Sequence, residues 1–358
     1  MADGSRCGGG ASPKHGVRAL VTGAAGFIGS HVTAALASAG AEVRAFDRQP
    51  VPEAPAGVEQ VAGDVLDRAA LERVMEGCDT VFHLAAVYSY ARADAGAMRA
   101  VNVEGTRRVL EAAARGGLRR RIVHTSSCGT CGPVAGRAAT EDDAPPAEEL
   151  SIPYKRTKLE GERLALRAAR DGIDVVVVNP TTPVGPGDRR PTPTGKMVAD
   201  VGCGRARAYL AGGALNVVAV EDVAIGHLRA HERGRRGERY LLGGENLAMR
   251  EVFAIVAAAA GRRPPRVGIP WAVASLGAHV ADAALRAVGR QPSLLVLDQV
   301  RLARLPMVFD DTKARRELGH RSRPAAEALS AAARAAVGVA NAIGTAEEAV
   351  EFRRSRAA

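Results

Sequence analysis

The first 180 residues alternate short apolar segments with longer amphipathic ones, and this alternation constrains the fold more than any other feature. Strands and helices that alternate in this way predict βαβ units, a parallel sheet and right-handed crossovers. Strands are predicted at 17–22, 42–46, 58–62, 80–85, 121–125 and 174–179, and helices at 28–39, 69–75, 97–115 and 154–169. We therefore predict an α/β protein with a Rossmann-type doubly wound parallel sheet, followed by a smaller C-terminal α+β part that binds substrate.

A glycine-rich turn, Thr22–Gly29, connects the first predicted strand to the first predicted helix. Glycines in this arrangement allow a tight turn, let the backbone approach a pyrophosphate and pack the helix on the strand. The free N–H groups and the positive dipole end of the helix attract the same anion. Dinucleotide contacts are predicted from Gly23, Ala25, Gly26, Phe27, Ile28 and Gly29.

The end of the second strand bears on the choice between NAD and NADP. Asp47 lies about 20 residues after the turn, where a carboxylate accepts both hydroxyls of an adenosine ribose. That carboxylate repels a 2′-phosphate, so NAD is the predicted cofactor. The neighbouring Arg48 can instead receive the phosphate, and NADP stays the alternative.

Later strand ends add further predicted cofactor contacts. Asp64 can accept a hydrogen bond from an adenine amino group, or it caps the next helix, and Val65 follows it. Small residues after the fourth strand allow the backbone to approach the cofactor. The remaining contacts predicted along this edge are Leu84, Ala85, Ala86 and Thr125.

Tyr154 and Lys158 are four residues apart, which places both side chains on one face of a helix. The ammonium there can lower the pKa of the phenol from its reference of about 10. Ser127 follows the fifth strand at the same edge and can hold a substrate oxygen beside the tyrosine. These three residues predict acid/base hydride transfer: Tyr154 exchanges a proton with a secondary alcohol or ketone, and the cofactor carries the hydride.

Closely spaced prolines after Asn179 predict the boundary of the first domain. We divide the chain into a disordered tail at 1–16, an NAD(P)-binding domain at 17–180, a substrate-binding part at 181–340 that shares some sheet elements, and a tail at 341–358. Pro180 and Thr182 are expected to approach the nicotinamide through backbone groups. The candidates for substrate contact are Tyr88, Ser127, Asn179 and Arg189, with Asn179 equally interpretable as a strand-end structural amide.

Composition limits the partners. Aromatic residues make up only 3% of the chain, so a stacking platform for nucleic acid is not expected, and the net charge of +10 is spread as scattered arginines. Five dispersed cysteines favour reduced thiols and a cytoplasmic location. Cys128 and Cys131 have half-site spacing, but no second pair follows, so no metal is predicted. The segment 271–288 is too polar to span a bilayer, which leaves a small-molecule substrate as the expected partner.

These motifs resemble the extended short-chain dehydrogenases/reductases, the NAD-dependent epimerase/dehydratase family. The matching positions are Thr22–Gly29, Asp64, Leu84–Ala86, Ser127, Tyr154 and Lys158. The closer resemblance is to hopanoid-associated sugar epimerases and dihydroflavonol-4-reductase-like proteins, on Asn179–Asp188, Pro191–Gly195 and Leu242–Leu247. It implies a homodimer formed through the helices at 97–115 and 154–169.

One departure from the resemblance bears on the substrate. Nucleotide-sugar epimerases of this type usually carry a diphosphate-binding arginine just before the strand that leads to the segment matched by Val220-Glu221-Asp222. Here that stretch is Ala214–Val218 and has no cation, so a diphosphate sugar is not expected unless Arg189, Arg190 or Lys196 substitutes for it. The resemblance implies an epimerase/dehydrogenase of a sugar-like substrate. The alternative is an NADPH-dependent ketone reductase resembling dihydroflavonol 4-reductase or 3β-hydroxysteroid dehydrogenase, with an apolar substrate.

Overall fold

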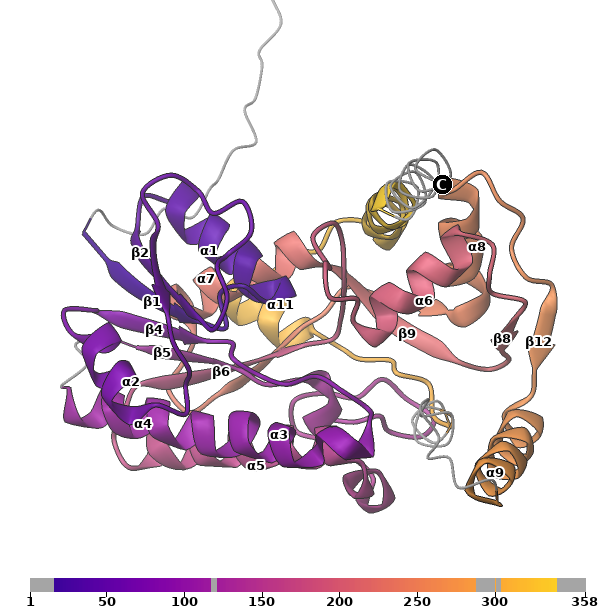
Figure 1. The fold of residues 1–358 in the computed structure, drawn as a ribbon, viewed down its shortest axis with the longest axis horizontal. Helices are drawn as coiled ribbons and strands as arrows, with labels where there is room; N and C mark the ends of the chain where they lie inside the picture. Colours follow the sequence, from indigo (N-terminus) through magenta and orange to yellow (C-terminus); the bar gives the residue numbers. More distant parts are fainter. Residues whose placement is uncertain (1–15, 117–120, 288–299, 301–303, 340–358) are drawn as a thin grey trace, which may run out of the picture.

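The computed structural model describes residues 16–116, 121–287, 300 and 304–339 (Figure 1). Apart from Gly16, the predicted tails at 1–16 and 341–358 lie outside the described residues. Within the described part, no helix is both long and apolar enough to cross a membrane.

A seven-stranded parallel sheet forms the centre of the molecule, as predicted. Its spatial order is β10-β6-β5-β4-β1-β2-β3, and every neighbouring pair runs parallel. Each of the six strands predicted before residue 180 is found within two residues of its predicted ends. The strands are β1 Arg18–Thr22, β2 Glu42–Asp47, β3 Glu59–Ala62, β4 Thr80–His83, β5 Ile122–Thr125, β6 Val175–Pro180 and β10 Arg239–Leu242. Chain order reverses between β1 and β4, where doubly wound sheets bind their ligands.

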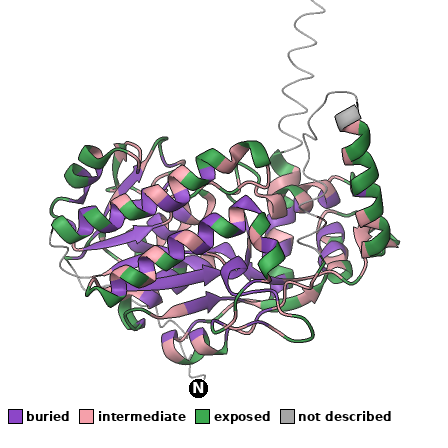
Figure 2. Cartoon of the chain, turned by 90° about the horizontal axis from the view of Figure 1, so that it is seen from below, coloured by how far each residue is buried: buried purple, intermediate pink, exposed green. Residues whose placement is uncertain are grey.

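Helices cover both faces of this sheet because its strands are apolar on both sides. One buried cluster joins β1 to α1 (Phe27–Ser38), α7 (Val220–Arg233) and α11 (Thr312–Leu318). The other joins the opposite face to α2 (Arg68–Met75), α4 (Thr106–Arg115) and α5 (Pro153–Arg170). Figure 2 shows the strands as buried between helices that are exposed on their outer sides.

The helix predicted at 97–115 has an interruption. It consists of α3 (Ala95–Arg99), a π-helical segment Ala100–Gly105, and α4. The segment contains the buried Asn102, whose side chain bonds to a neighbouring loop. Wide turns of this type commonly occur at functional sites.

The chain after Pro180 builds a smaller α+β part and also returns to the central sheet through α7, β10 and α11. Its own strands form two small sheets, β11-β9-β7 and β12-β8. The elements are β7 Thr182–Val184, α6 Pro193–Gly202, β8 Ala208–Leu210, β9 Ala214–Ala219, β11 Glu245–Ala248, α8 Met249–Ala259, β12 Val267–Ile269, α9 Trp271–Ala287 and a helix over 325–339. The division of the chain into two domains stays a prediction.

Candidate active site

The glycine-rich turn leaves no room for side chains. Gly23 has φ of +73°, and a Cβ there would lie 2.5 Å from the Ala85 nitrogen. A Cβ on Gly29 would lie 2.0 Å from the Gly23 carbonyl oxygen. No side chain caps the N-terminus of α1, whose N-cap residue is Gly26. The first N–H groups of the helix therefore point to a place where a pyrophosphate can bind.

Gly29→Ala is expected to reduce the free energy of unfolding by about 2–3 kcal/mol, because the new methyl group overlaps backbone that cannot move independently. Dinucleotide binding should weaken with it. Gly96→Ala is the matched control, since a Cβ at that helical position meets nothing within 4 Å. Urea unfolding and cofactor titration of both variants test this, and equal stability of the two would contradict the packing argument.

The residues predicted to bind the adenosine part of the cofactor lie at the carboxyl ends of β2 and β3. The Asp47 carboxylate accepts the Ala25 N–H at 3.1 Å and so holds the turn against β2. Asp64 accepts the Leu66 N–H at 2.9 Å and lies 3.8 Å from the Arg48 guanidinium. The suggestion that Asp64 caps α2 is wrong: the N-cap is Asp67, three residues later.

Tyr154 and Lys158 both lie in the first turns of α5, below the ends of β5 and β6. The Lys158 ammonium donates to the Thr125 carbonyl oxygen at 2.7 Å, and burial lowers the pKa of Lys158 to about 8. Burial, reinforced by the nearby Tyr90, raises the pKa of Tyr154, while the Ser127 hydroxyl opposes that rise. The expectation that Lys158 lowers the pKa of the phenol is therefore wrong for this structure.

Two further tyrosines pack on the Tyr154 ring. Tyr88 is tilted by 37° to it with ring centroids 4.4 Å apart, and Tyr90 meets it edge-on at 6.0 Å. The hydroxyl groups of Tyr88 and Tyr90 are 3.0 Å apart. Sequence analysis proposed Tyr88 but missed Tyr90, although the Tyr-x-Tyr spacing after β4 was a usable signal.

Asn102 holds the loop that carries these tyrosines. Its amide bonds to the Val87 N–H at 2.8 Å, to the Val87 carbonyl at 3.1 Å and to the Thr157 hydroxyl at 3.1 Å. The side chain thereby ties the loop after β4 to α5, next to Lys158. This agrees with the supporting role that a polar residue on a buried helix suggests.

Asn179 lies beneath the site and does not line the cavity. Its amide group is fully buried and donates to the Ser127 carbonyl at 3.1 Å and to the Glu162 carboxylate at 2.7 Å. Glu162 in turn pairs with Arg239 at 2.9 Å. Of the two interpretations of Asn179, these contacts favour the structural amide, which fixes the Ser127 loop.

A cavity of about 540 Å³ joins the glycine turn to the tyrosines. Ser126 lines it, and the buried hydroxyl of Ser126 has no hydrogen-bond partner among the described residues. Predicted residues that line the cavity are Gly23, Gly26, Phe27, Ile28, Gly29, Leu84, Ala86, Tyr88, Thr125, Ser127, Tyr154, Lys158, Pro180 and Thr182. The lining residues that sequence analysis missed include Tyr90, Met197, Leu215, Met249, Leu305 and Met307.

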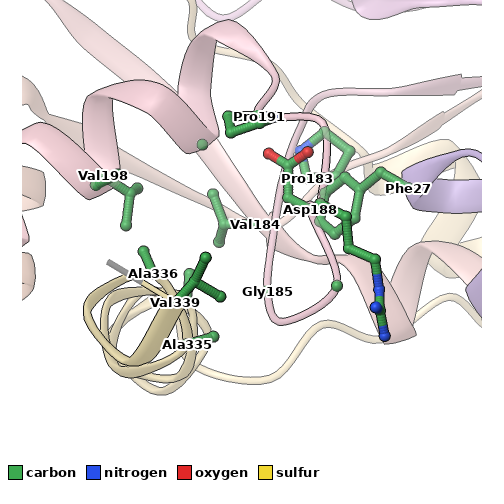
Figure 3. A pocket seen from close by; sticks show the side chains of 15 residues that line it. Phe27, Pro183, Val184, Gly185, Asp188, Pro191, Val198, Ala335, Ala336 and Val339 are labelled. Carbon is green, nitrogen blue, oxygen red and sulfur yellow. The ribbon is translucent and has the colours of Figure 1, made fainter. Parts of the chain in front are cut away.

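Arg189 is not among the residues that line the Tyr154 cavity, and its contact with substrate stays a prediction. Its guanidinium bonds to Glu53 at 2.5 Å and lines a neighbouring cavity of about 590 Å³. Figure 3 shows this second cavity between Phe27, Val198 and Val339.

The paired cysteines are buried thiols. Cys128 lines the Tyr154 cavity, and burial raises its pKa to about 12. Burial also raises the pKa of Cys131. Neither forms a disulfide.

Comparison with known proteins identifies the family. Residues 19–243 match the model of the NAD dependent epimerase/dehydratase family. A "Putative dihydroflavonol 4-reductase" from Synechocystis is 38% identical over 308 residues, 84% of this chain and 89% of the relative. "Sterol demethylase protein B" from Methylococcus capsulatus is 35% identical over 304 residues, which cover 84% of this chain and 92% of the relative. A "4-hydroxy-2-methyl-3-oxo-4-farnesyl-3,4-dihydroquinoline-1-oxide ketoreductase" from Stigmatella aurantiaca is 32% identical over 315 residues, which cover 86% of this chain and 92% of the relative.

Solved structures agree with this placement. The crystal structure of gox2253 superposes with a TM-score of 0.76 at 35% identity, covering 88% of this chain and 97% of the other. MoeE5 in complex with UDP-glucose and NAD gives a TM-score of 0.69 at 27% identity, with coverage of 88% and 97%. The predicted fold, enzyme class and NAD cofactor are thus confirmed at the level of the family. The chain belongs to the NAD-dependent epimerase/dehydratase family, and it is an enzyme of the extended short-chain dehydrogenase/reductase type.

Proposed function

We propose that this protein is an NAD(P)-dependent oxidoreductase that interconverts a secondary alcohol and a ketone on a largely apolar substrate. The observation that carries the proposal is the lining of the cavity beside Tyr154. Away from the glycine turn most of its large side chains are aromatic, thioether or aliphatic, and the smaller Thr192, Pro193 and Thr194 lie among them. The large apolar and aromatic residues are Tyr88, Tyr90, Met197, Leu215, Met249, Leu305 and Met307.

Charge supports the same choice. The two lysines of the lining are already engaged: Lys155 pairs with the buried Glu149, and Lys158 donates to a backbone carbonyl. Among the described residues, no arginine lines this cavity. A sugar diphosphate would bring negative charge into a space without a free cation, at a cost that apolar substrates avoid. Leu215 and Ala214 line the cavity in the stretch where the family resemblance leads us to expect an arginine.

Some relatives support this substrate class. The Stigmatella aurantiaca relative is named a ketoreductase of a farnesylated quinoline oxide, and the Methylococcus capsulatus relative is named for sterols. Solved structures also include enzymes in complex with UDP-glucose. The apolar lining favours the first group, so the reductase is proposed over the sugar epimerase.

Each residue of the site has a separate role in the proposed reaction. A bound nicotinamide supplies or accepts the hydride at carbon. Tyr154 donates the phenolic proton to the ketone oxygen in reduction and receives it back in oxidation. The Ser127 hydroxyl, which is close enough to affect the pKa of Tyr154, holds that oxygen. Lys158 contributes its charge and fixes the cofactor ribose, and the glycine turn binds the pyrophosphate.

Cofactor oxidation with a panel of substrates tests the proposal. Purified protein is expected to oxidise NADH or NADPH with apolar cyclic or long-chain ketones and to release the cofactor after each turnover. UDP-sugars should give no turnover and no epimer. Tightly retained NAD together with epimerisation of a UDP-sugar would reverse the choice and restore the epimerase.

The Lys158 pKa predicts the pH dependence. Its pKa is lowered to about 8 from 10.5, so the ammonium is present below pH 8 and is lost above it. The raised pKa of Tyr154 keeps the phenol protonated over the same range. For ketone reduction, kcat/KM for the cofactor, which reports the free enzyme, should fall about tenfold per pH unit above about 8. In Lys158→Arg the cation persists, so this descending limb should disappear; an unchanged limb would assign it to another group.

A further inference from the structure

The outward face of α9 is apolar. Val273, Leu276 and Val280 are 60%, 67% and 61% exposed, and Gly277 and Ala284 on the same side are also exposed. These five residues, which we call the α9 face, fall on one side of a helix of 3.6 residues per turn. Figure 1 shows α9 at an edge of the molecule far from the central sheet, and Figure 2 shows most of its surface exposed.

The inward side of α9 also carries apolar residues. The positions turned toward the protein are the buried Ala278 and the partly buried Trp271, Ala274, Ser275, Asp282 and Leu285. A helix that only packs on a core has polar residues on the side that faces water, which the α9 face lacks. Contiguous exposed apolar side chains of this kind mark an interaction surface.

The charge of the segment before α9 favours an anionic partner. Arg262, Arg263 and Arg266 lie in the exposed segment that leads through β12 into α9. From 261 to 285 the sequence has these three arginines and a single acidic residue, Asp282. Exposed Val267 adds to the apolar surface between them. Arginines beside an apolar helix face complement an anionic lipid surface, in which headgroups meet the guanidinium groups and acyl chains meet the helix.

The start of α9 also lies near the substrate cavity. The Trp271 indole N–H donates to the Val300 carbonyl at 2.7 Å, and the Arg304 guanidinium lies 5.7 Å from the Trp271 ring centroid. Leu305, the next residue, lines the cavity beside Tyr154. A surface that covers α9 therefore lies close to one wall of the active site.

We propose that the α9 face and the three arginines dock this enzyme on the surface of an anionic lipid bilayer. The helix rests in the headgroup region and does not cross the bilayer. An apolar substrate dissolved in the membrane is then delivered near the cavity. This delivery rests on the proposed function, whereas lipid binding does not.

Co-sedimentation with lipid vesicles tests the docking. Full-length protein is expected to bind vesicles of phosphatidylcholine with about one third phosphatidylglycerol, and to remain free with phosphatidylcholine alone. Leu276→Glu together with Val280→Glu should weaken binding on the order of tenfold or more, because two exposed apolar side chains no longer enter the bilayer. Replacing Arg262, Arg263 and Arg266 with glutamine should weaken it by a similar factor, as should high salt.

Val339→Glu is the matched control, since Val339 is 61% exposed on another helix and should leave lipid binding unchanged. Turnover of a water-soluble ketone should be equal in all the variants, which shows that they fold. Failure of the wild-type protein to bind anionic vesicles would overturn the proposal. A concentration-dependent dimer that the α9 substitutions dissociate would overturn it too, by assigning the face to a second copy. Lipid binding without ketone turnover would instead count against the proposed function alone.

Discussion

Tyr154→Phe is expected to lower kcat by about 10²–10⁴-fold, the range that a positioned acid/base group contributes. The substitution removes only the hydroxyl that donates the proton. The ring remains, so its packing against Tyr88, with centroids 4.4 Å apart, should persist. Cofactor affinity and thermal stability should therefore stay close to those of the wild type. Steady-state kinetics beside cofactor titration separate the lost chemistry from lost binding.

Tyr90→Phe is the companion variant for this experiment. It removes only the hydroxyl of Tyr90, whose ring approaches the Tyr154 ring edge-on at 6.0 Å. We expect it to change kcat far less than Tyr154→Phe, since Tyr154 alone is assigned the proton transfer. Wild-type kcat in Tyr154→Phe, or a larger loss in Tyr90→Phe, would contradict the assignment.

Glu162→Ala is expected to give the largest loss of stability, about 3–5 kcal/mol of unfolding free energy. The Glu162 side chain is 1% exposed and bonds at once to Arg239, Thr130 and Asn179. Its removal leaves a largely buried guanidinium without its carboxylate and frees the amide that holds the Ser127 carbonyl. Activity should fall as well, because the Ser127 loop loses its support.

Glu160→Ala on the same helix is the control for this variant. Glu160 also pairs with an arginine, Arg99 at 2.8 Å, but the two side chains are 32% and 69% exposed. Screened pairs of this kind contribute about 0–1 kcal/mol. Chemical unfolding of both variants measures the difference, and losses of equal size would mean that burial of the Glu162 network does not matter.

Local sequence signals predicted the central sheet and most of the site. The apolar strands, the glycine turn and the Tyr154 to Lys158 spacing each depend on neighbours within a few residues along the chain. The carboxyl ends of parallel strands then meet at one edge, so Thr125 and Gly23 come together once the sheet order is known. For such residues the sequence pattern alone predicts their place in the fold.

Residues that depend on tertiary packing were not predictable. Leu305 and Met307 reach the cavity from about 150 residues beyond Tyr154, with no motif of their own. Burial and the nearby Tyr90 raise the pKa of Tyr154, whereas the sequence led us to expect that the Lys158 ammonium lowers it. Arg189 lines a neighbouring cavity together with residues of the helix over 325–339, which no local motif indicates. These three features depend on which side chains lose contact with water or face each other in the folded protein. The spacing of residues along the sequence does not specify this.

The homodimer stays a prediction, since it rests on the family resemblance. We expect the molecular mass measured by light scattering in solution to be twice the 37.1 kDa of one chain. A monomer at all concentrations would contradict it without affecting the proposed chemistry.

Isotope transfer tests the central claim most directly. The protein is mixed with nicotinamide cofactor deuterated at C4 and an apolar ketone, and the product is analysed by mass spectrometry and NMR. We predict deuterium on the carbinol carbon of the alcohol, with label transfer lost in step with kcat in Tyr154→Phe. Label that stays on the cofactor with every apolar ketone, while a UDP-sugar is epimerised, would contradict the account.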